Sequence, residues 1–172
     1  EPVPAARPVE SAFRLVAEVW RIDDARTAAA AGANEIALDP FLRHPATPRA
    51  RVMALRDELT VSGVTLRIRT PTVVRPDDRR ALDPWLATGL PLLTGHLGLL
   101  ADKGGAGHDV VADYAINAFN PHTARELFRL GARRITPSIE LPENEIETLV
   151  APWNGRGFEV LVYGRTEGMT TE

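Results

Sequence analysis

The chain contains no cysteine among its 172 residues. It therefore has no disulfide framework, no thiol nucleophile and no cysteine-ligated metal of its own. No apolar run approaches the roughly 20 residues that a membrane-spanning helix needs, so we expect no membrane partner. A strong excess of one charge is also missing, because the net charge is only -3. This balance gives no support for a general nucleic-acid or membrane-surface binder.

The composition that remains is that of an ordinary globular domain. Hydrophobic residues make up 44% of the chain and charged residues 25%, and 172 residues are enough for one domain with a sizeable core. No signal peptide is visible, so a cytoplasmic location is predicted. Residues 1–12 contain three prolines and little pattern, and we interpret them as a linker or arm. The start at Glu1 and the stop at Glu172 suggest a piece of a longer chain with other domains.

Short apolar segments alternate with helical patterns over residues 13–172, which we interpret as a single domain. Seven segments are predicted as strands: 13–20, 35–38, 64–69, 90–94, 109–114, 134–138 and 158–163. The predicted helices are 24–31, 49–62, 78–86, 122–130 and 143–150, with a brief helical turn at 97–101. Such a rhythm implies parallel strands with right-handed crossovers.

A recurring unit favours a barrel over an open doubly wound sheet. A predicted helix is followed by Gly-Ala and then by a strand at Gly32 and again at Gly131. We therefore predict an α/β fold of the TIM-barrel type with about seven parallel strands. A closed eight-stranded barrel typically needs roughly 200–250 residues, so this barrel is expected to be compact, distorted or incomplete. Pro137 predicts an edge, a bulge or an early end for the sixth strand.

Polar residues gather where the predicted strands end, and the ends of parallel barrel strands meet at one mouth. The richest stretch is 109–120, where an apolar strand leads into Asp113, Asn117 and Asn120. The other candidate site residues at strand ends are His96, Ser138, Glu140, Tyr163 and Arg165. The four histidines lack partners at metal-ligand spacing, so no metal site is predicted.

Each candidate also has a purely structural interpretation. Asp113 and Asn117 can cap the element that follows them, as Asp and Asn commonly do at strand ends. His96 can be a partly buried histidine that forms hydrogen bonds. Glu140 can stabilise a helix N-terminus, and Arg165 can form a surface ion pair. Nucleotide-binding glycine motifs and serine-hydrolase or zinc-protease motifs are missing from the sequence.

Three ordered segments resemble one protein family. Residues 113–120 (DYAINAFN), 130–141 (LGARRITPSIEL) and 162–172 (VYGRTEGMTTE) are similar to D-Y-S-L-N-V-F-N, L-G-v-x-R-v-T-L-S-P-E-L and V-x-G-R-x-P-L-M-x-x-E of the collagenase-like U32 peptidases. Residues 93–99 resemble the v-G-N-L-G-A-L turn of the same family. The chain departs from the family pattern at Ile139, which replaces a proline, and at Tyr163, where many members have histidine.

The resemblance implies a variant TIM-type barrel that hydrolyses peptide or protein substrates. Without a serine or cysteine nucleophile, hydrolysis would use an activated water, with Glu140 as general base and Arg165 stabilising negative charge. Asp113, Asn117, Asn120, Ser138, Tyr163 and His96 would bind substrate. No cofactor is expected within this chain, and the isolated 172 residues are expected to be inactive.

Two alternatives stay open. Some family members act in oxygen-independent hydroxylation of RNA or of quinone precursors, with iron–sulfur clusters held by cysteines that begin just after the residue matching Glu172. The chain would then be the cysteine-free barrel part of such a protein, RNA could be a partner, and a metal or cluster would belong to the full-length protein. In the second alternative, the barrel is a non-catalytic binding domain.

Overall fold

The computed structural model describes residues 13–42 and 46–164. Six strands are present, namely β1 (Val16–Val19), β2 (Glu35–Leu38), β3 (Thr65–Arg69), β4 (Leu92–Thr94), β5 (Val110–Ala112) and β6 (Arg134–Ile135). The α-helices are α1 (Ile22–Ala30), α2 (Arg49–Val61), α3 (Arg79–Leu86), α4 (Leu97–Leu99), α5 (Pro121–Arg129) and α6 (Glu143–Val150). Four short helical turns complete the structure: η1 (Pro76–Asp78), η2 (Leu100–Gly104), η3 (Tyr114–Ile116) and η4 (Ala151–Trp153).

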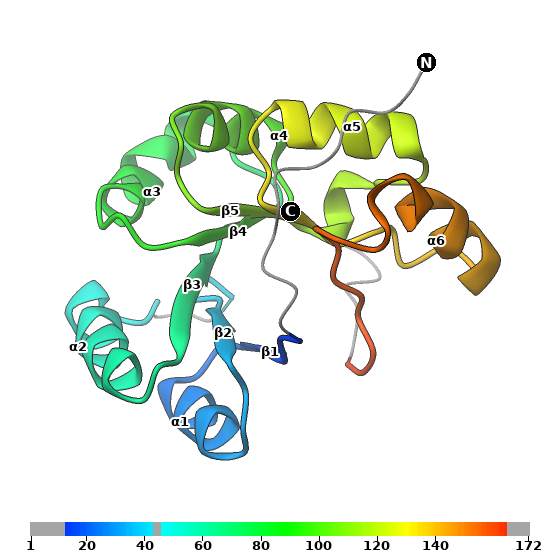
Figure 1. Cartoon of the computed structure of the whole chain (residues 1–172). Helices are drawn as coiled ribbons and strands as arrows, with labels where there is room; N and C mark the ends of the chain where they lie inside the picture. The colour runs from blue at the N-terminus through cyan, green and yellow to red at the C-terminus, as the bar shows by residue number, and fades with distance from the viewer. Residues whose placement is uncertain (1–12, 43–45, 165–172) are drawn as a thin grey trace.

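The strands form one parallel sheet in the order β1-β2-β3-β4-β5-β6. Figure 1 shows this sheet curled, with the helices on its outside. The curl is strong, because Glu35 of β2 and Arg134 of β6 meet at 2.5 Å although three strands separate them in the sheet. Within the described residues, β6 does not pair with β1, so the sheet is an open half-barrel. The predicted α/β fold of the TIM-barrel type is confirmed.

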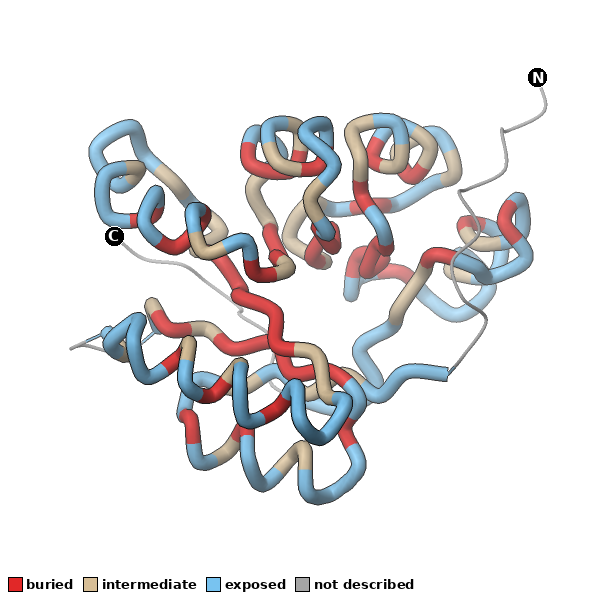
Figure 2. The backbone as a smooth tube through the Cα atoms, turned by 60° about the vertical axis from the view of Figure 1, so that its left-hand side comes forward, coloured by how far each residue is buried: buried red, intermediate tan, exposed pale blue. Residues whose placement is uncertain are grey.

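The two faces of the sheet differ in chemistry. Alternate residues such as Ile36, Ile68 and Val110 belong to the large apolar core between strands and helices, and the buried residues follow this layer in Figure 2. The opposite, concave face carries only a small apolar cluster, formed by Ala37, Leu93 and Val111. Charged side chains occupy the remaining positions of the concave face, because side chains alternate between the two faces along each strand.

Six of the seven predicted strands are present among the described residues. Residues 158–163 form a single isolated bridge, in which Phe158 pairs with Ile135. The Ile135 N–H donates to the Gly157 carbonyl at 2.9 Å, and the Glu159 N–H donates to the Ile135 carbonyl at 3.1 Å. The next donor in a parallel ladder would be the nitrogen of residue 137, which is proline and has no N–H. Pro137 therefore ends β6 early and leaves the following segment unpaired.

The repeated Gly-Ala unit is a helix C-terminal motif. Gly32 and Gly131 have φ angles of 103° and 104°, and the N–H of the following alanine donates to a helix carbonyl five residues earlier at 3.0 Å in both cases. This left-handed glycine is the usual C-terminal stop of a helix. The Gly-Ala pattern thus marks the C-terminal ends of α1 and α5, after which the chain continues into β2 and β6.

Gly131 has a second constraint, which gives a stability prediction. A Cβ at position 131 would lie 2.7 Å from the Cα of Gly104, whereas a Cβ at Gly32 would meet nothing within 4 Å. Gly131→Ala is expected to lower the free energy of unfolding by about 2–4 kcal/mol, the sum of backbone strain and overlap. Gly32→Ala is the matched control, with a loss of about 1 kcal/mol from strain alone. Urea denaturation measures both, and equal losses would contradict the close approach of Gly104 and Gly131.

Candidate functional site

Four charged side chains meet on the concave face near the C-terminal ends of the strands, and we call them the mouth cluster. They are Glu18, Asp39, Arg69 and Asp113. The guanidinium of Arg69 is central: its nitrogens lie 3.1 Å from Asp113 Oδ2, 3.4 Å from Asp39 Oδ2 and 3.7 Å from Glu18 Oε2. It also lies over the ring of Tyr114, 6.0 Å from the centroid. The cluster therefore draws its residues from four places in the sheet: β1, the end of β2, β3 and the end of β5.

Local structure holds two of these carboxylates in place. Asp113 follows β5 and is 1% exposed, and its Oδ1 accepts a hydrogen bond from the Tyr114 N–H at 2.7 Å. Asp39 follows β2, and its Oδ1 accepts from the N–H groups of Phe41 and Leu42 at 2.8 and 3.0 Å. Each aspartate thus caps its own turn with one oxygen and binds Arg69 with the other.

Glu18 is the member of the cluster whose proton affinity is changed most clearly. Burial of its carboxyl on the concave face, and then the nearby carboxylate of Asp113, raise the pKa of Glu18 to about 7, although Arg69 acts in the opposite direction. Its side chain keeps 39% of its surface exposed. A carboxyl that is half ionised near neutral pH and open to solvent is suited to general acid–base chemistry.

A second ionic group, the inner network, lies towards the N-terminal ends of the strands. Glu35 and Arg67 are at its centre, 2.7 Å apart, and both are fully buried. Arg134 bridges Glu35 at 2.5 Å and Glu159 at 2.8 Å, and Asp109 binds Arg67 at 3.2 Å. Burial raises the pKa of Glu35, but Arg67 and Arg134 outweigh this effect and leave that pKa lowered. The inner network is a structural element that fills the half-barrel.

An apolar cavity of about 290 Å³, the rim cavity, lies between the loop after β6 and the segment that follows Phe158. Its walls are formed by Pro137, Ser138, Ile139, Leu141, Ile146, Val160 and Leu161. Ser138 supplies a hydroxyl in this otherwise apolar lining. A cavity of this kind can accept one apolar side chain.

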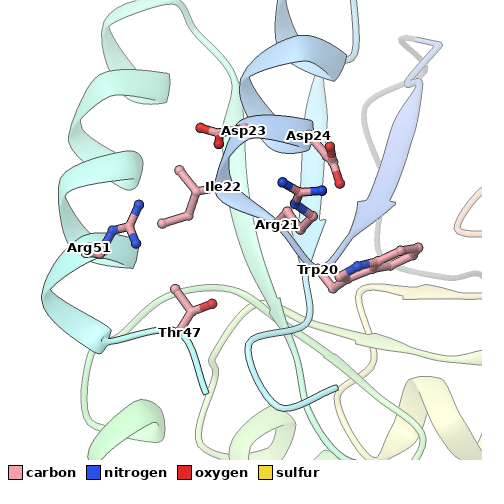
Figure 3. Close-up of a pocket in the computed structure, with 7 residues that line it drawn as sticks. All are labelled: Trp20, Arg21, Ile22, Asp23, Asp24, Thr47 and Arg51. Carbon is pink, nitrogen blue, oxygen red and sulfur yellow. The ribbon is translucent and has the colours of Figure 1, made fainter. Parts of the chain in front are cut away.

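A larger and more polar cavity of about 560 Å³ lies beyond the end of β1, between α1 and α2. Figure 3 shows Arg51 of α2 reaching towards Ile22, and Trp20 and Arg21 on the other side of the α1 start. Asp23 and Asp24 also line it, so the two signs of charge are balanced.

The structure distributes the predicted site residues over several places. Asp113 belongs to the mouth cluster, and Ser138 lines the rim cavity. Glu140 is exposed in the turn after β6, where its N–H donates to Ser138 Oγ at 3.4 Å. Tyr163 is 94% exposed on the unpaired segment. Arg165 lies outside the described residues.

The three other predicted residues form local caps. His96 Nδ1 accepts a hydrogen bond from the Leu99 N–H at 3.2 Å. Asn120 caps α5, because its Oδ1 accepts from the Thr123 N–H at 3.0 Å. Asn117 has a left-handed backbone with φ of 61° and ends η3. These local roles agree with the structural interpretation of His96 and Asn117, and the role of all three residues as substrate ligands stays a prediction.

The sequence places Asp39 and Arg69 at strand ends of the mouth, but neither they nor Glu18 was among the predicted site residues. A signal for two of them exists in the alternation of the strands. Glu18 interrupts an apolar segment, and Arg69 alternates with Leu66 and Ile68 in β3. In a curled sheet covered by helices on one side, such charged positions face the interior of the barrel.

A metal site and a membrane-spanning helix each place requirements on the described residues. Residues 13–42 and 46–164 contain no group of three or more His, Asp or Glu side chains that could hold a metal ion. The sequence also offers no thiolate for an iron–sulfur cluster, so its residues do not fit such a group. No helix in the same ranges is long and apolar enough to cross a membrane.

Comparison with known proteins gives one structural relative. No protein-family model matches the sequence, and no curated protein matches it. A solved structure described as the U32 peptidase Mk0906 superposes with a TM-score of 0.65 at 18% sequence identity. The match covers 91% of this chain and 70% of that chain. The likeness shows that the half-barrel has a U32-like fold.

Proposed function

We propose that this chain is the barrel domain of a U32-type peptidase that hydrolyses peptide bonds with an activated water. The observation that carries the proposal is the mouth cluster, in which a solvent-accessible carboxyl of pKa about 7 lies beside a guanidinium. A general base is most effective when its pKa lies near the working pH. The U32-like fold supports the choice of substrate, since the solved relative is described as a peptidase.

In the proposed reaction, ionised Glu18 removes a proton from a water molecule. The water oxygen bonds to the peptide carbonyl carbon, and the carbonyl oxygen becomes an oxyanion. As the carbon–nitrogen bond breaks, protonated Glu18 returns the proton to the leaving amine. Arg69 is the cation of the cluster and faces this developing negative charge, while Asp113 and Asp39 fix its orientation.

The sequence-based candidates keep a place in this proposal. Glu140 competes with Glu18 for the role of general base, and Arg165 would add a second guanidinium. Ser138 is a proposed substrate contact because it lines the rim cavity, and Tyr163 is one because its side chain is 94% exposed on the segment that follows Leu161. We favour Glu18 over Glu140 as the base, because Glu18 lies in the mouth cluster beside Arg69 and its pKa is raised into the neutral range.

The test is a cleavage assay on the full natural protein and, separately, on the 172 residues alone. A mixture of unmodified peptides is incubated in water enriched in ¹⁸O, and the products are analysed by mass spectrometry. We expect new peptide ends that carry one ¹⁸O atom in the new carboxylate. Intact peptides with the full protein would refute the proposal, and turnover by the 172 residues would exclude a purely non-catalytic barrel.

A further inference from the structure

Residues 160–163, which we call the unpaired edge, have no backbone hydrogen-bond partner within the described part of the chain. The pairing of the segment 158–163 with β6 stops at the Glu159 N–H, because Pro137 has no N–H to continue the ladder. Val160, Val162 and Tyr163 are also mainly exposed, at 52%, 80% and 94%. An unpaired backbone with apolar side chains is a template for the addition of another strand.

The rim cavity lies directly beside this edge. Val160 and Leu161 contribute to its lining, together with Ile139 from the loop after β6 and Ile146 of α6. In strand addition, backbone hydrogen bonds supply affinity and pockets for alternate side chains supply specificity. The unpaired edge supplies backbone hydrogen-bonding groups, and the cavity supplies a pocket for a side chain. Together they are suited to bind an extended peptide.

The edge is also close to the mouth cluster. Glu159 precedes Val160 directly, and its carboxylate is near enough to Glu18 to contribute to the raised pKa of that residue. The mouth cluster contains three carboxylates and one guanidinium, while Glu159 is neutralised by Arg134. The surroundings are therefore negative overall, and they favour a neutral or basic ligand over an acidic one.

We infer that the rim cavity binds an apolar side chain of an extended, neutral or basic peptide whose backbone pairs with residues 160–163. This assignment rests on the proposed peptidase function and names its substrate class. The peptide would enter as an added strand, with one side chain in the cavity and its backbone running towards Glu18.

The experiment is a binding measurement by fluorescence anisotropy with the full natural protein in the Glu18→Gln form, so that cleavage does not interfere. The probe is a fluorescein-labelled hexapeptide with a central leucine flanked by lysines. Val160→Asp is expected to weaken binding about tenfold or more, because it places a charge in the apolar wall. Val61→Asp, at an exposed apolar side chain on the distant helix α2, is the control and should change nothing.

Three further probes test the binding mode. Methylation of alternate backbone nitrogens should weaken binding about tenfold by removing hydrogen-bond donors. Replacement of the central leucine by serine should have an effect of similar size, and glutamates in place of the flanking lysines should also weaken binding. Equal affinity for all these probes, or for the Val160→Asp and Val61→Asp proteins, would overturn the inference.

Two outcomes separate this inference from the proposed function. If the peptides bind with the expected pattern but no protein form cleaves them, the peptidase function fails and the binding site stands. If cleavage depends on Glu18 while Val160→Asp leaves KM unchanged, the function stands and this site fails. Sedimentation velocity adds one more arm: a dimer that dissociates in Val160→Asp only would assign the edge to a second copy of the chain and overturn the peptide assignment.

Discussion

Glu18→Gln is expected to reduce kcat for peptide cleavage about 10²–10⁴-fold, the usual contribution of a positioned general base. Glutamine has the size and shape of glutamate but cannot take up the proton of the attacking water. KM should stay close to its original value, because Glu18 is proposed to act on the water and not on the bound peptide. Initial rates over a range of peptide concentrations separate the two constants.

The pH dependence makes this prediction more specific. Because the pKa of Glu18 is about 7, the ionised base becomes more abundant as the pH rises, and kcat/KM of the natural protein should increase up to about pH 7 and then level off. The Glu18→Gln protein should lack this rise. A rise that persists with the same midpoint would assign the titration to another group.

The expected fall in the cleavage rate of Glu18→Gln does not come from a loss of stability of the folded protein. The folded state raises the pKa of Glu18 above the ordinary value of 4.5, so it binds a proton that the unfolded chain releases. The stabilisation from this group is fully present below about pH 4.5 and is lost as the pH rises through about 7. Neutral glutamine resembles the protonated form, and Glu18→Gln should therefore be at least as stable as the natural protein at pH 8.

Glu140→Gln is the matched control for this experiment. The side chain of Glu140 is exposed in the turn after β6, and we expect its replacement to change kcat by no more than about twofold. The reverse pattern, with a large loss in Glu140→Gln and none in Glu18→Gln, would transfer the role of general base to Glu140.

Arg67→Met is expected to lower the free energy of unfolding by about 3–5 kcal/mol, a large part of the total stability of a domain. Arg67 binds the buried carboxylate of Glu35 at 2.7 Å, the Leu92 carbonyl at 2.9 Å and the carboxylate of Asp109 at 3.2 Å. Without Arg67, fewer favourable interactions offset the loss of water around the buried carboxylate of Glu35. Urea denaturation at neutral pH measures the effect.

Arg26→Met provides the comparison at the surface. Arg26 binds Glu58 at 2.9 Å and Asp23 at 3.2 Å, but all three side chains are largely exposed. Water and salt screen such pairs, so the loss of stability should be far smaller than that of Arg67→Met. A similar small loss in Arg67→Met would show that the inner network does not hold the half-barrel together.

A double variant distinguishes two explanations of the Arg67 effect. If the cost comes from an uncompensated carboxylate, Glu35→Leu combined with Arg67→Met should lose less stability than the sum of the single variants. Arg134 would keep Glu159 as its partner at 2.8 Å. An additive result would instead mean that Arg67 contributes through its contacts with Leu92 and Asp109 alone.

Local patterns predicted the elements of the fold well where their cause is local. The Gly-Ala unit at Gly32 and Gly131 marked two helix ends because a left-handed backbone requires glycine there. The alternation in residues 64–69 located β3. The segment 158–163 does not form the predicted strand although its own residues favour one, because the missing hydrogen-bond donor lies on the neighbouring segment, at Pro137.

The candidate site also combines a residue that local sequence predicts with residues that only the fold brings together. Asp113 was selected because it ends an apolar strand, which is visible in the sequence. Its partner Arg69 lies 44 residues away, and Glu18 lies on a third strand. Only the curl of the sheet decides that these three side chains meet, and the pKa of Glu18 follows from that meeting.

The sequence by itself determined the alternation of strands and helices, the parallel sheet that such crossovers require and the absence of thiol chemistry, because each depends on residue type and short-range spacing. The tertiary structure alone decided which charges pair in the inner network and which collect at the mouth. The physical reason is that side-chain electrostatics acts over a few ångströms in space, and the curvature of the half-barrel brings together residues that are far apart along the chain.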